Sequence, residues 1–245
     1  MPANVLVLGC GRSGTSIFGE LFEAFDGYRY LSEPRLDDID RGVHAGPIAV
    51  KVPREAPGST VPSGCSVSVD AVRAVVGDPL VVFWQVRHPL DTVCSLRVGI
   101  DDGWAHHPRP ADWQDWLQRP LLERCAHHWA TINEDGYDHV RAVAVVNRFE
   151  DMLSDPQACA RRTAELIGVD SRGSEAAIER WSDRVQDTNN AHFIEARTSR
   201  RHSRIDHVHR VGRWRENLTE TEVESIHTLI SPGARTFGYE LPHPG

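Results

Sequence analysis

Several features that would place this chain in other protein classes are missing from its 245 residues. No apolar run approaches the ~20 residues that a membrane-spanning helix needs, and no secretory leader precedes the first apolar segment, so we predict no membrane association. The five cysteines are widely spaced, odd in number and free of C-x-x-C pairs. This pattern favours a reducing compartment, and we therefore predict a cytoplasmic protein.

Lysine is almost absent: Lys51 is the single lysine of the sequence, and arginine supplies the other positive charges. The formal net charge of −8 at pH 7 argues against a general nucleic-acid binder, although an acidic protein can still hold a local basic pocket. The sequence also lacks a linker, an internal repeat and a low-complexity run. With 40% hydrophobic residues, it predicts a single α/β domain over residues 1–245.

A glycine-rich loop, residues 9–16, joins the first predicted strand to the first predicted helix. Residues 5–8 alternate valine and leucine, and an apolar helical face runs over residues 17–25. Glycines let the backbone turn its N–H groups inward, and a helix N-terminus adds unpaired N–H groups and a positive dipole end. The segment adds one positive charge and three hydroxyl groups, from Arg12, Ser13, Thr15 and Ser16. The sequence therefore predicts that a phosphate, or an anion of similar shape, binds here.

The glycines of this loop fit two nucleotide-binding patterns. Gly9, Gly11 and Gly14 spell G-x-G-x-x-G, and the carboxylate of Glu33 follows about 20 residues later, as in a dinucleotide-binding fold. Gly9 and Gly14 also have the spacing of a Walker loop, but Thr15 follows where that motif needs a lysine. A tight turn without any ligand remains a third interpretation, so the later segments must decide.

Strands and helices alternate along the rest of the chain, as they do in parallel sheets with helices on both faces. The predicted strands cover residues 28–31, 47–53, 80–86 and 139–147. The predicted helices cover residues 66–76, a segment after residue 89, residues 120–132, 155–168, 172–190, and 219–231, with Pro232 and Gly233 ending the last one. We expect residues 35–47 and 99–110 to be loops. The predicted fold is a three-layer α/β/α arrangement with a central, mostly parallel sheet and a P-loop-like phosphate-binding loop.

Charged side chains occur at the predicted carboxyl ends of strands, where ligands of open parallel sheets bind. Glu33 follows the second strand, and its alternative interpretation is a solvated loop carboxylate. Lys51 interrupts the third strand, and a buried lysine needs an anion unless its ammonium group reaches solvent at an edge. Arg87 follows the fourth strand, and Ser95 lies eight residues later on the next helix. These two residues could converge on a second phosphate.

Residues 197–213 form the one strongly basic stretch, with six arginines and three histidines. The stretch suits a lid that orders over an anionic ligand, although a solvated basic loop fits the composition equally well. The pairs His106–His107 and His127–His128 raise a zinc hypothesis. We disfavour it, because no cysteine or histidine lies at the usual zinc-ligand spacings.

Taken together, these segments resemble the sulfotransferases that use 3′-phosphoadenosine 5′-phosphosulfate (PAPS). Residues 11–16 resemble the 5′-phosphosulfate loop of the carbohydrate and related bacterial branch, in which arginine replaces the lysine of the cytosolic branch. Arg87 with Ser95 matches the family's 3′-phosphate motif. Residues 148–152 resemble its Arg-Tyr-Glu-Asp-Leu segment, and residues 212–219 resemble its Gly-x-Trp-Lys-Asn-x-Phe-Thr block.

The resemblance implies a role for individual residues. It assigns donor binding to Gly11, Arg12, Ser13, Gly14, Thr15, Ser16, Arg87, Ser95, Phe149, Gly212, Arg213 and Trp214, and catalysis to Glu33, Arg12 and Lys51. Two departures stand out. Pro53 occupies the position of the catalytic histidine in the cytosolic Lys-Thr-His motif, and residues 207–209 replace an Arg-Lys-Gly triplet. Because Glu33-Pro34 resembles the Glu-Pro of the carbohydrate branch, the resemblance implies that Glu33 is the general base.

The function implied is transfer of a sulfuryl group from PAPS to a hydroxyl, or an amine, of a small-molecule or carbohydrate acceptor, with PAP as product. No metal is expected, because arginine and lysine supply the positive charge that Mg²⁺ supplies in ATPases. Two alternatives stay open: an NAD(P)-dependent oxidoreductase that uses the G-x-G-x-x-G loop, and a PAPS- or nucleotide-binding module without catalysis.

Overall fold

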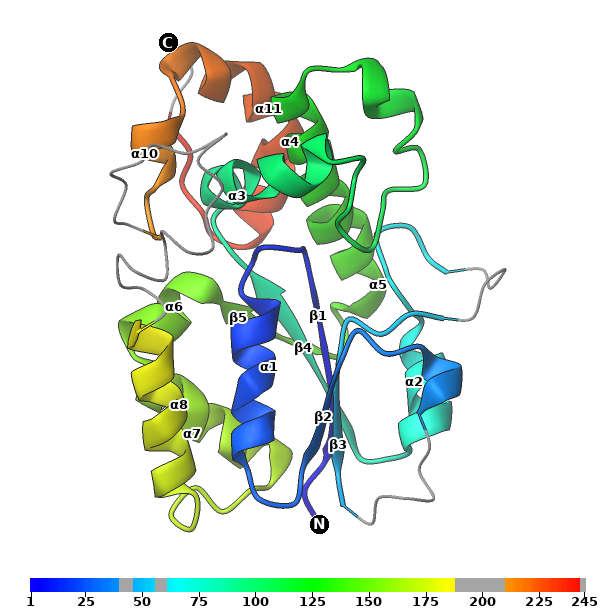
Figure 1. The fold of residues 1–245 in the computed structure, drawn as a ribbon, viewed down its shortest axis with the longest axis vertical. Helices are drawn as coiled ribbons and strands as arrows, with labels where there is room; N and C mark the ends of the chain where they lie inside the picture. Colours follow the sequence, from blue (N-terminus) through cyan, green and yellow to red (C-terminus); the bar gives the residue numbers. More distant parts are fainter. Residues whose placement is uncertain (40–45, 56–60, 188–209, 243–245) are drawn as a thin grey trace.

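A computed structural model of the protein describes residues 1–39, 46–55, 61–187 and 210–242. Within these residues, five strands form one sheet in the order β2-β3-β1-β4-β5, and every neighbouring pair is parallel (Figure 1). The strands are β1 (Asn4–Gly9), β2 (Arg29–Ser32), β3 (Ile48–Lys51), β4 (Leu80–Val86) and β5 (Ala144–Arg148). The central strand β1 pairs along its whole length with β4, from Asn4 opposite Leu80 to Gly9 opposite Gln85.

Helices connect the strands and cover the sheet. They are α1 (Thr15–Ala24), α2 (Val69–Val76), α3 (Pro89–Asp101), α4 (Leu121–Thr131), α5 (Tyr137–Val140), α6 (Phe149–Ser154), α7 (Pro156–Ile167), α8 (Glu175–Asp187), α10 (Trp214–Asn217) and α11 (Glu220–Thr236). The shorter turns are η1 (Leu36–Asp38), η2 (Asp115–Gln118) and the π-helical η3 (Ile132–Gly136). No helix in the described part of the chain is long and apolar enough to cross a bilayer.

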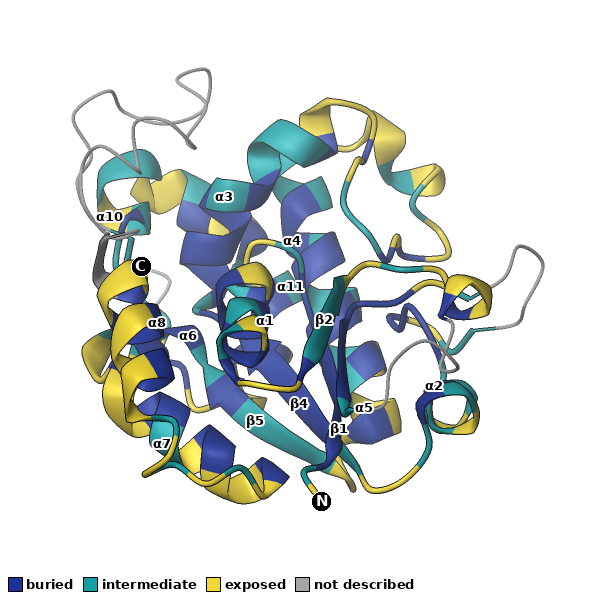
Figure 2. Ribbon diagram, turned by 60° about the horizontal axis from the view of Figure 1, so that its bottom comes forward, coloured by how far each residue is buried: buried dark blue, intermediate teal, exposed yellow. Residues whose placement is uncertain are grey.

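The alternation of side chains along β1 divides the core into two halves. Val5 and Val7 pack with residues of α1, α7 and α8, whereas Leu6 and Leu8 pack with residues of α3, α4 and α11 on the other face. Figure 1 shows α1, α7 and α8 on one side of the sheet and α2 and α5 on the other. Figure 2 shows that β1 and most of β4 are buried, that β2 and β5 are largely of intermediate burial, and that the outer helix faces are exposed. The predicted three-layer α/β/α fold is confirmed.

The end of β1 approaches its neighbour so closely that only glycine fits. Gly9 has φ +141°, and a Cβ atom added there would lie 2.1 Å from the backbone oxygen of Gln85. Gly14, at the N-cap of α1, has φ +91° and would bring a Cβ atom to 2.5 Å from the Phe149 ring. Two glycines therefore fix where the chain leaves β1 and where it enters α1, which holds the glycine-rich loop over the carboxyl edge of the sheet.

Two sequence predictions about elements were wrong. Residues 139–147 do not form one strand, because residues 137–140 make the short helix α5 and β5 begins only at Ala144. Within this segment, Val140 is buried in the helical turn, whereas the side chain of the next residue, Arg141, is mostly exposed. Helix α11 does not stop at Pro232 but continues to Thr236. There, the N–H of Gly233 donates to Glu134 Oε1 at 3.0 Å, so a side chain provides a partner where proline disturbs the helical pattern.

Smaller boundary differences have local causes. The helix predicted from residue 66 begins at Val69, because the Ser68 side chain caps it by accepting from the N–H of Ala71. Helix α3 extends to Asp101, into the predicted loop 99–110. The predicted loop 35–47 contains η1, and its residues 40–45 lie outside the described part.

Replacing Gly9 by alanine should destabilise the fold through the clash with the Gln85 carbonyl. Overpacking costs ~1–3 kcal/mol, and here the obstacle is backbone, which cannot rotate away. The matched control is Gly27→Ala, because Gly27 also has positive φ (+84°) but nothing lies within 4 Å of its added Cβ. We expect Gly9→Ala to lower the free energy of unfolding by about 1–3 kcal/mol more than Gly27→Ala, measured by urea denaturation. Equal losses would show that backbone strain alone, and not the close approach, requires Gly9.

Candidate active site

The glycine-rich loop contains a hydroxyl group that is buried without a partner. Ser13 is fully buried, and its Oγ atom has no hydrogen-bond partner among the described residues. The neighbouring Arg12 adopts a left-handed backbone conformation with φ +68°. A buried polar atom without a hydrogen bond is costly, and strained backbone is concentrated at functional sites. Both observations mark this loop as a ligand site.

Two polar side chains inside the sheet hold the loop in place. The Nε2 of Gln85, on β4, donates to the carbonyl oxygen of Ser13 at 3.1 Å. The Nδ2 of Asn147, on β5, donates in turn to Gln85 Oε1 at 2.7 Å. Our sequence analysis missed both residues. The signal was present for Gln85, which is the one polar residue in the apolar run of β4.

Arg87 and Ser95, which the sequence predicted to converge, both reach the glycine-rich loop. Arg12 Nε donates to Ser95 Oγ at 3.0 Å, and Arg87 NH1 donates to the carbonyl oxygen of Arg12 at 3.2 Å. The guanidinium carbon of Arg87 lies 4.6 Å from the centroid of the Phe149 ring, which itself packs against Gly14. Residues from the glycine-rich loop, the end of β4, α3 and α6 thus lie next to one another.

Two further arginines bring positive charge to the same place. Burial lowers the pKa of Arg210 to about 9, with the charges of Arg87 and Arg12 adding to the effect. Burial, together with the charge of Arg87, lowers the pKa of Arg213 to about 10. A cluster of cations that is partly desolvated favours the binding of an anion with several charges.

Asp91 fixes the C-terminal side of the site. Its nearly fully buried carboxylate accepts from the N–H of Gly212 at 2.7 Å and from the N–H of Trp214 at 3.0 Å. The Trp214 ring is parallel to the ring of His88, with 6.2 Å between their centroids. Sequence analysis missed Asp91, because nothing local distinguishes a first-turn helix carboxylate that bonds to backbone more than 120 residues away. Most of the predicted basic lid, residues 197–209, lies outside the described residues.

Glu33, Lys51 and Arg54 form an ion-pair cluster at the ends of β2 and β3. Lys51 Nζ lies 2.7 Å from Glu33 Oε1, and Arg54 NH2 lies 3.0 Å from Glu33 Oε2. The buried Lys51 also donates to Ser16 Oγ at 3.4 Å, which links Glu33 to the first turn of α1. Burial would raise the pKa of Glu33, but hydrogen bonds and charges from Lys51 and Arg54 outweigh it, so the pKa is lowered. Glu33 is therefore ionised at neutral pH.

His106 completes the wall next to the glycine-rich loop. Its ring packs against Gly11, where an added Cβ would lie 3.4 Å from Nδ1, and against Gly99 of α3. Burial lowers the pKa of both His106 and His107 to about 4, helped by the charges of Arg12 and Arg54 respectively, so both rings are neutral at pH 7. Within the described residues, no three His, Cys, Asp or Glu side chains are placed to hold a metal ion.

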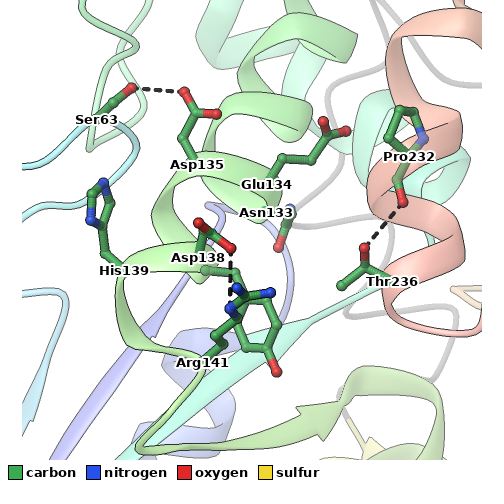
Figure 3. A pocket seen from close by; sticks show the side chains of 10 residues that line it. Ser63, Asn133, Glu134, Asp135, Asp138, His139, Arg141, Pro232 and Thr236 are labelled. Atoms are coloured by element: carbon green, nitrogen blue, oxygen red, sulfur yellow. Dashed lines mark hydrogen bonds and ion pairs between the residues drawn. The ribbon is translucent and has the colours of Figure 1, made fainter.

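A separate pocket lies on the face covered by η3, α5 and the end of α11 (Figure 3). Three of its lining residues are acidic: Glu134, Asp135 and Asp138. None of the residues that the sequence predicted for the site lines this pocket. Its acidic lining does not suit a polyanion, so we place the functional site at the glycine-rich loop.

Sequence comparisons find no relative, since no protein-family model and no curated protein matches the chain. Solved structures do match. The sulfotransferase domain from the curacin biosynthetic pathway has a TM-score of 0.61 and 12% identity over 99% of this chain and 99% of that one. The mouse sulfotransferase SULT7A1, complexed with PAP, has a TM-score of 0.58 and 15% identity over 95% of this chain and 84% of that one. The sulfotransferase STF9 from Mycobacterium avium has a TM-score of 0.55 and 14% identity over 97% and 77%.

This chain has the sulfotransferase fold. At these identities the likeness establishes the fold alone, so the assignment of individual residues depends on the geometry described above. The sequence-predicted residues of the sulfotransferase resemblance fall into two groups in space. One surrounds the glycine-rich loop with Arg87, Ser95, Phe149 and residues 212–214, and the other is the Glu33 and Lys51 pair.

Removing the Asp91 carboxylate should release residues 212–214 from helix α3. Hydrogen bonds to charged groups contribute roughly 1.5–3 kcal/mol each, so losing one raises the population of the open segment about 10- to 150-fold. We expect Asp91→Ala to accelerate hydrogen exchange at the Gly212 and Trp214 amides by at least ~10-fold, measured by mass spectrometry. Asp91→Asn, which keeps one acceptor oxygen, should lie between Asp91→Ala and the unmodified protein. Unchanged exchange in both variants would mean that Asp91 does not hold this segment.

Proposed function

We propose that the protein is a PAPS-dependent sulfotransferase, which moves a sulfuryl group from PAPS to a hydroxyl or amine of a small-molecule or carbohydrate acceptor and releases PAP. The observation that carries this proposal is the convergence of four arginines on the glycine-rich loop, where the buried Ser13 hydroxyl has no partner among the described residues. These arginines are Arg12, Arg87, Arg210 and Arg213. PAP carries phosphates at both its 3′ and 5′ positions. The proposed donor site has two sets of anion-binding residues, one in the glycine-rich loop and one made of Arg87 and Ser95, which suits such a ligand.

The two charged ends of the donor are assigned to these two sets of residues. Residues 11–16 would hold the 5′-phosphosulfate through backbone N–H groups, hydroxyls and Arg12. Arg87 and Ser95 would hold the 3′-phosphate, and Gly212, Arg213, Trp214 and Phe149 would complete the nucleotide site. The support for this assignment is that Ser95 and Arg87 both contact Arg12, one through its side chain and the other through its backbone, so they lie next to the loop that would bind the other end of the donor.

Transfer requires a base on the acceptor side and positive charge on the donor side. Glu33 takes the proton from the acceptor hydroxyl, whose oxygen forms a bond to sulfur while the bond from sulfur to the 5′-phosphate oxygen of PAPS breaks. The electron pair of that bond stays on PAP. Arg12 and Lys51 stabilise this developing negative charge, and Lys51 is suited to the task because it reaches both Glu33 and Ser16. These cations supply the charge stabilisation, so we propose transfer without a metal ion.

The two alternative functions fit the geometry less well. An NAD(P)-dependent oxidoreductase would use the glycine-rich loop and Glu33, but it would give no role to the arginines that converge on the loop. A nucleotide-binding module without catalysis would not need that ion-pair cluster. We further propose that residues 1–245 act as one domain in the cytoplasm, where the five free and buried cysteines would stay reduced.

Arg87→Ala should weaken binding of PAP far more than binding of adenosine 5′-phosphosulfate, which lacks the 3′-phosphate. One charge-assisted hydrogen bond corresponds to about 10- to 150-fold in affinity. We expect a loss of this size for PAP and a change of less than ~3-fold for the analogue, measured by isothermal titration calorimetry. Equal losses for both ligands would refute the assignment of Arg87 to the 3′-phosphate.

Glu33→Gln should reduce turnover while leaving donor affinity nearly unchanged. A positioned general base contributes about 10²–10⁴-fold, and glutamine keeps the shape of the side chain but cannot accept the proton. We expect kcat to fall by that factor and the Kd for PAP to change little. The matched comparison is His106→Gln. If Glu33→Gln turns over normally and His106→Gln is inactive, the base is the histidine.

A further inference from the structure

Residues 103–113 are fixed to the protein core beside the glycine-rich loop. Trp104 is fully buried, and its Nε1 donates to His128 Nδ1 at 3.1 Å. His106 packs against Gly11, and also against Gly99, where an added Cβ would lie 2.4 Å from its Nε2. The segment therefore has little freedom to move, and the residues that follow His106 have defined positions next to the site.

Arg109 is held in this segment as an oriented cation. Its Nε donates to the carbonyl oxygen of Trp104 at 2.7 Å, and its guanidinium carbon lies 4.6 Å from the centroid of the Trp113 ring. None of the described carboxylates forms an ion pair with it. A guanidinium group fixed by one hydrogen bond and one aromatic face can still bind an anion with its two terminal nitrogens.

His107 lies within electrostatic reach of both Arg109 and the Glu33 cluster. Burial is the main cause that lowers the pKa of His107 to about 4. The charges of Arg54 and Arg109 lower it further, and the charge of Glu33 opposes the shift. Its Nε2 atom is buried and has no hydrogen-bond partner in the described part of the chain. At neutral pH this ring is an uncharged hydrogen-bonding group located among two arginines and the proposed base.

The charges that act on His107 are more positive than negative. Lys51 also contacts Ser16 at the glycine-rich loop, so it is the cation that can serve the donor. Among the described residues whose charges act on His107, Arg54 and Arg109 are positive and Glu33 is the one carboxylate. A neutral acceptor that covered these groups would desolvate a positive charge without pairing it, whereas an anionic acceptor would supply the missing charge.

On the basis of the proposed function, we infer that the acceptor carries an anionic group, such as a carboxylate, near the hydroxyl that is sulfonated. The hydroxyl lies at Glu33, the anionic group is bound by Arg109 and Arg54, and His107 Nε2 adds a hydrogen bond. The protein would then sulfonate hydroxy acids in preference to neutral alcohols or phenols.

A panel of hydroxycarboxylic acids, each paired with its own primary amide, tests this inference. Each pair is incubated with PAPS, and mass spectrometry follows the gain of one sulfo group. We expect kcat/KM for the acids to exceed that for the amides by about 10- to 150-fold, the effect of one charge-assisted hydrogen bond. Amides that react as well as their acids, or better, would overturn the inference.

Variants of two arginines that lie over tryptophan rings locate the effect. Arg109→Gln should abolish most of the preference for acids and leave PAP affinity unchanged, while Arg109→Lys, which keeps the charge, should retain part of it. Arg119→Gln is the matched control, because Arg119 also lies over a tryptophan, Trp116, with 5.9 Å between guanidinium carbon and ring centroid. It should keep the full preference. An equal loss for acids and amides in Arg109→Gln, with unchanged PAP affinity, would contradict the inference.

The two levels of the proposal fail differently. If PAP binds but no acid of the panel is sulfonated while a neutral acceptor is, the acceptor class is wrong and the sulfotransferase proposal stands. If PAP does not bind, the proposed function itself is overturned, and the acceptor inference falls with it.

Discussion

The guanidinium group of Arg87 joins four segments that are far apart in the sequence. It follows β4, donates to the backbone of Arg12 in the glycine-rich loop and of Arg210 near the C-terminus, and lies over the ring of Phe149 at the start of α6. Each of these contacts is with a part of the chain that carries proposed donor-binding residues. The Arg87 side chain therefore links the glycine-rich loop to the segment that begins at Arg210 through two hydrogen bonds.

The arrangement concentrates positive charge in a protein of net charge −8. The cost is visible in the lowered pKa values of Arg210 and Arg213, which burial and neighbouring cations produce together. Such a site is stabilised when an anion neutralises it, so ligand binding should contribute to the stability of the folded protein. Lys51 and Arg54 keep Glu33 ionised. The proposed base therefore belongs to a different cluster from the proposed donor-binding arginines.

Local patterns in the sequence were sufficient for much of the fold and for the residues of the loop. The strand, glycine turn and helix around residues 4–24 form as predicted, and so does the parallel sheet. Predictions failed where long-range contacts override local preference. Helix α11 continues past Pro232 because Glu134, about 100 residues away, accepts a hydrogen bond from the N–H of Gly233. Asp91 could not be recognised for the same reason, since its partners, Gly212 and Trp214, lie far along the chain.

The residue assignments of the donor site stay predictions. Arg87 and Ser95 both contact Arg12, whereas their spacing predicted convergence on a second phosphate, which stays a prediction. Lys51 contacts Glu33 although the two residues belong to different strand ends. Most of the basic stretch after residue 196 lies outside the described residues, so its role as a lid stays a prediction. The acceptor side depends on residues 103–113, whose sequence has no periodicity from which contacts could be predicted.

The most direct test of the central claim is a calorimetric titration of the purified protein with PAP, followed by a second titration with NAD. A donor site built from the glycine-rich loop and the arginines predicts saturable binding of one PAP per chain, weakened by added salt because the contacts are charged. It predicts no detectable binding of NAD under the same conditions. Binding of NAD without binding of PAP would contradict the account and favour a dinucleotide-dependent function.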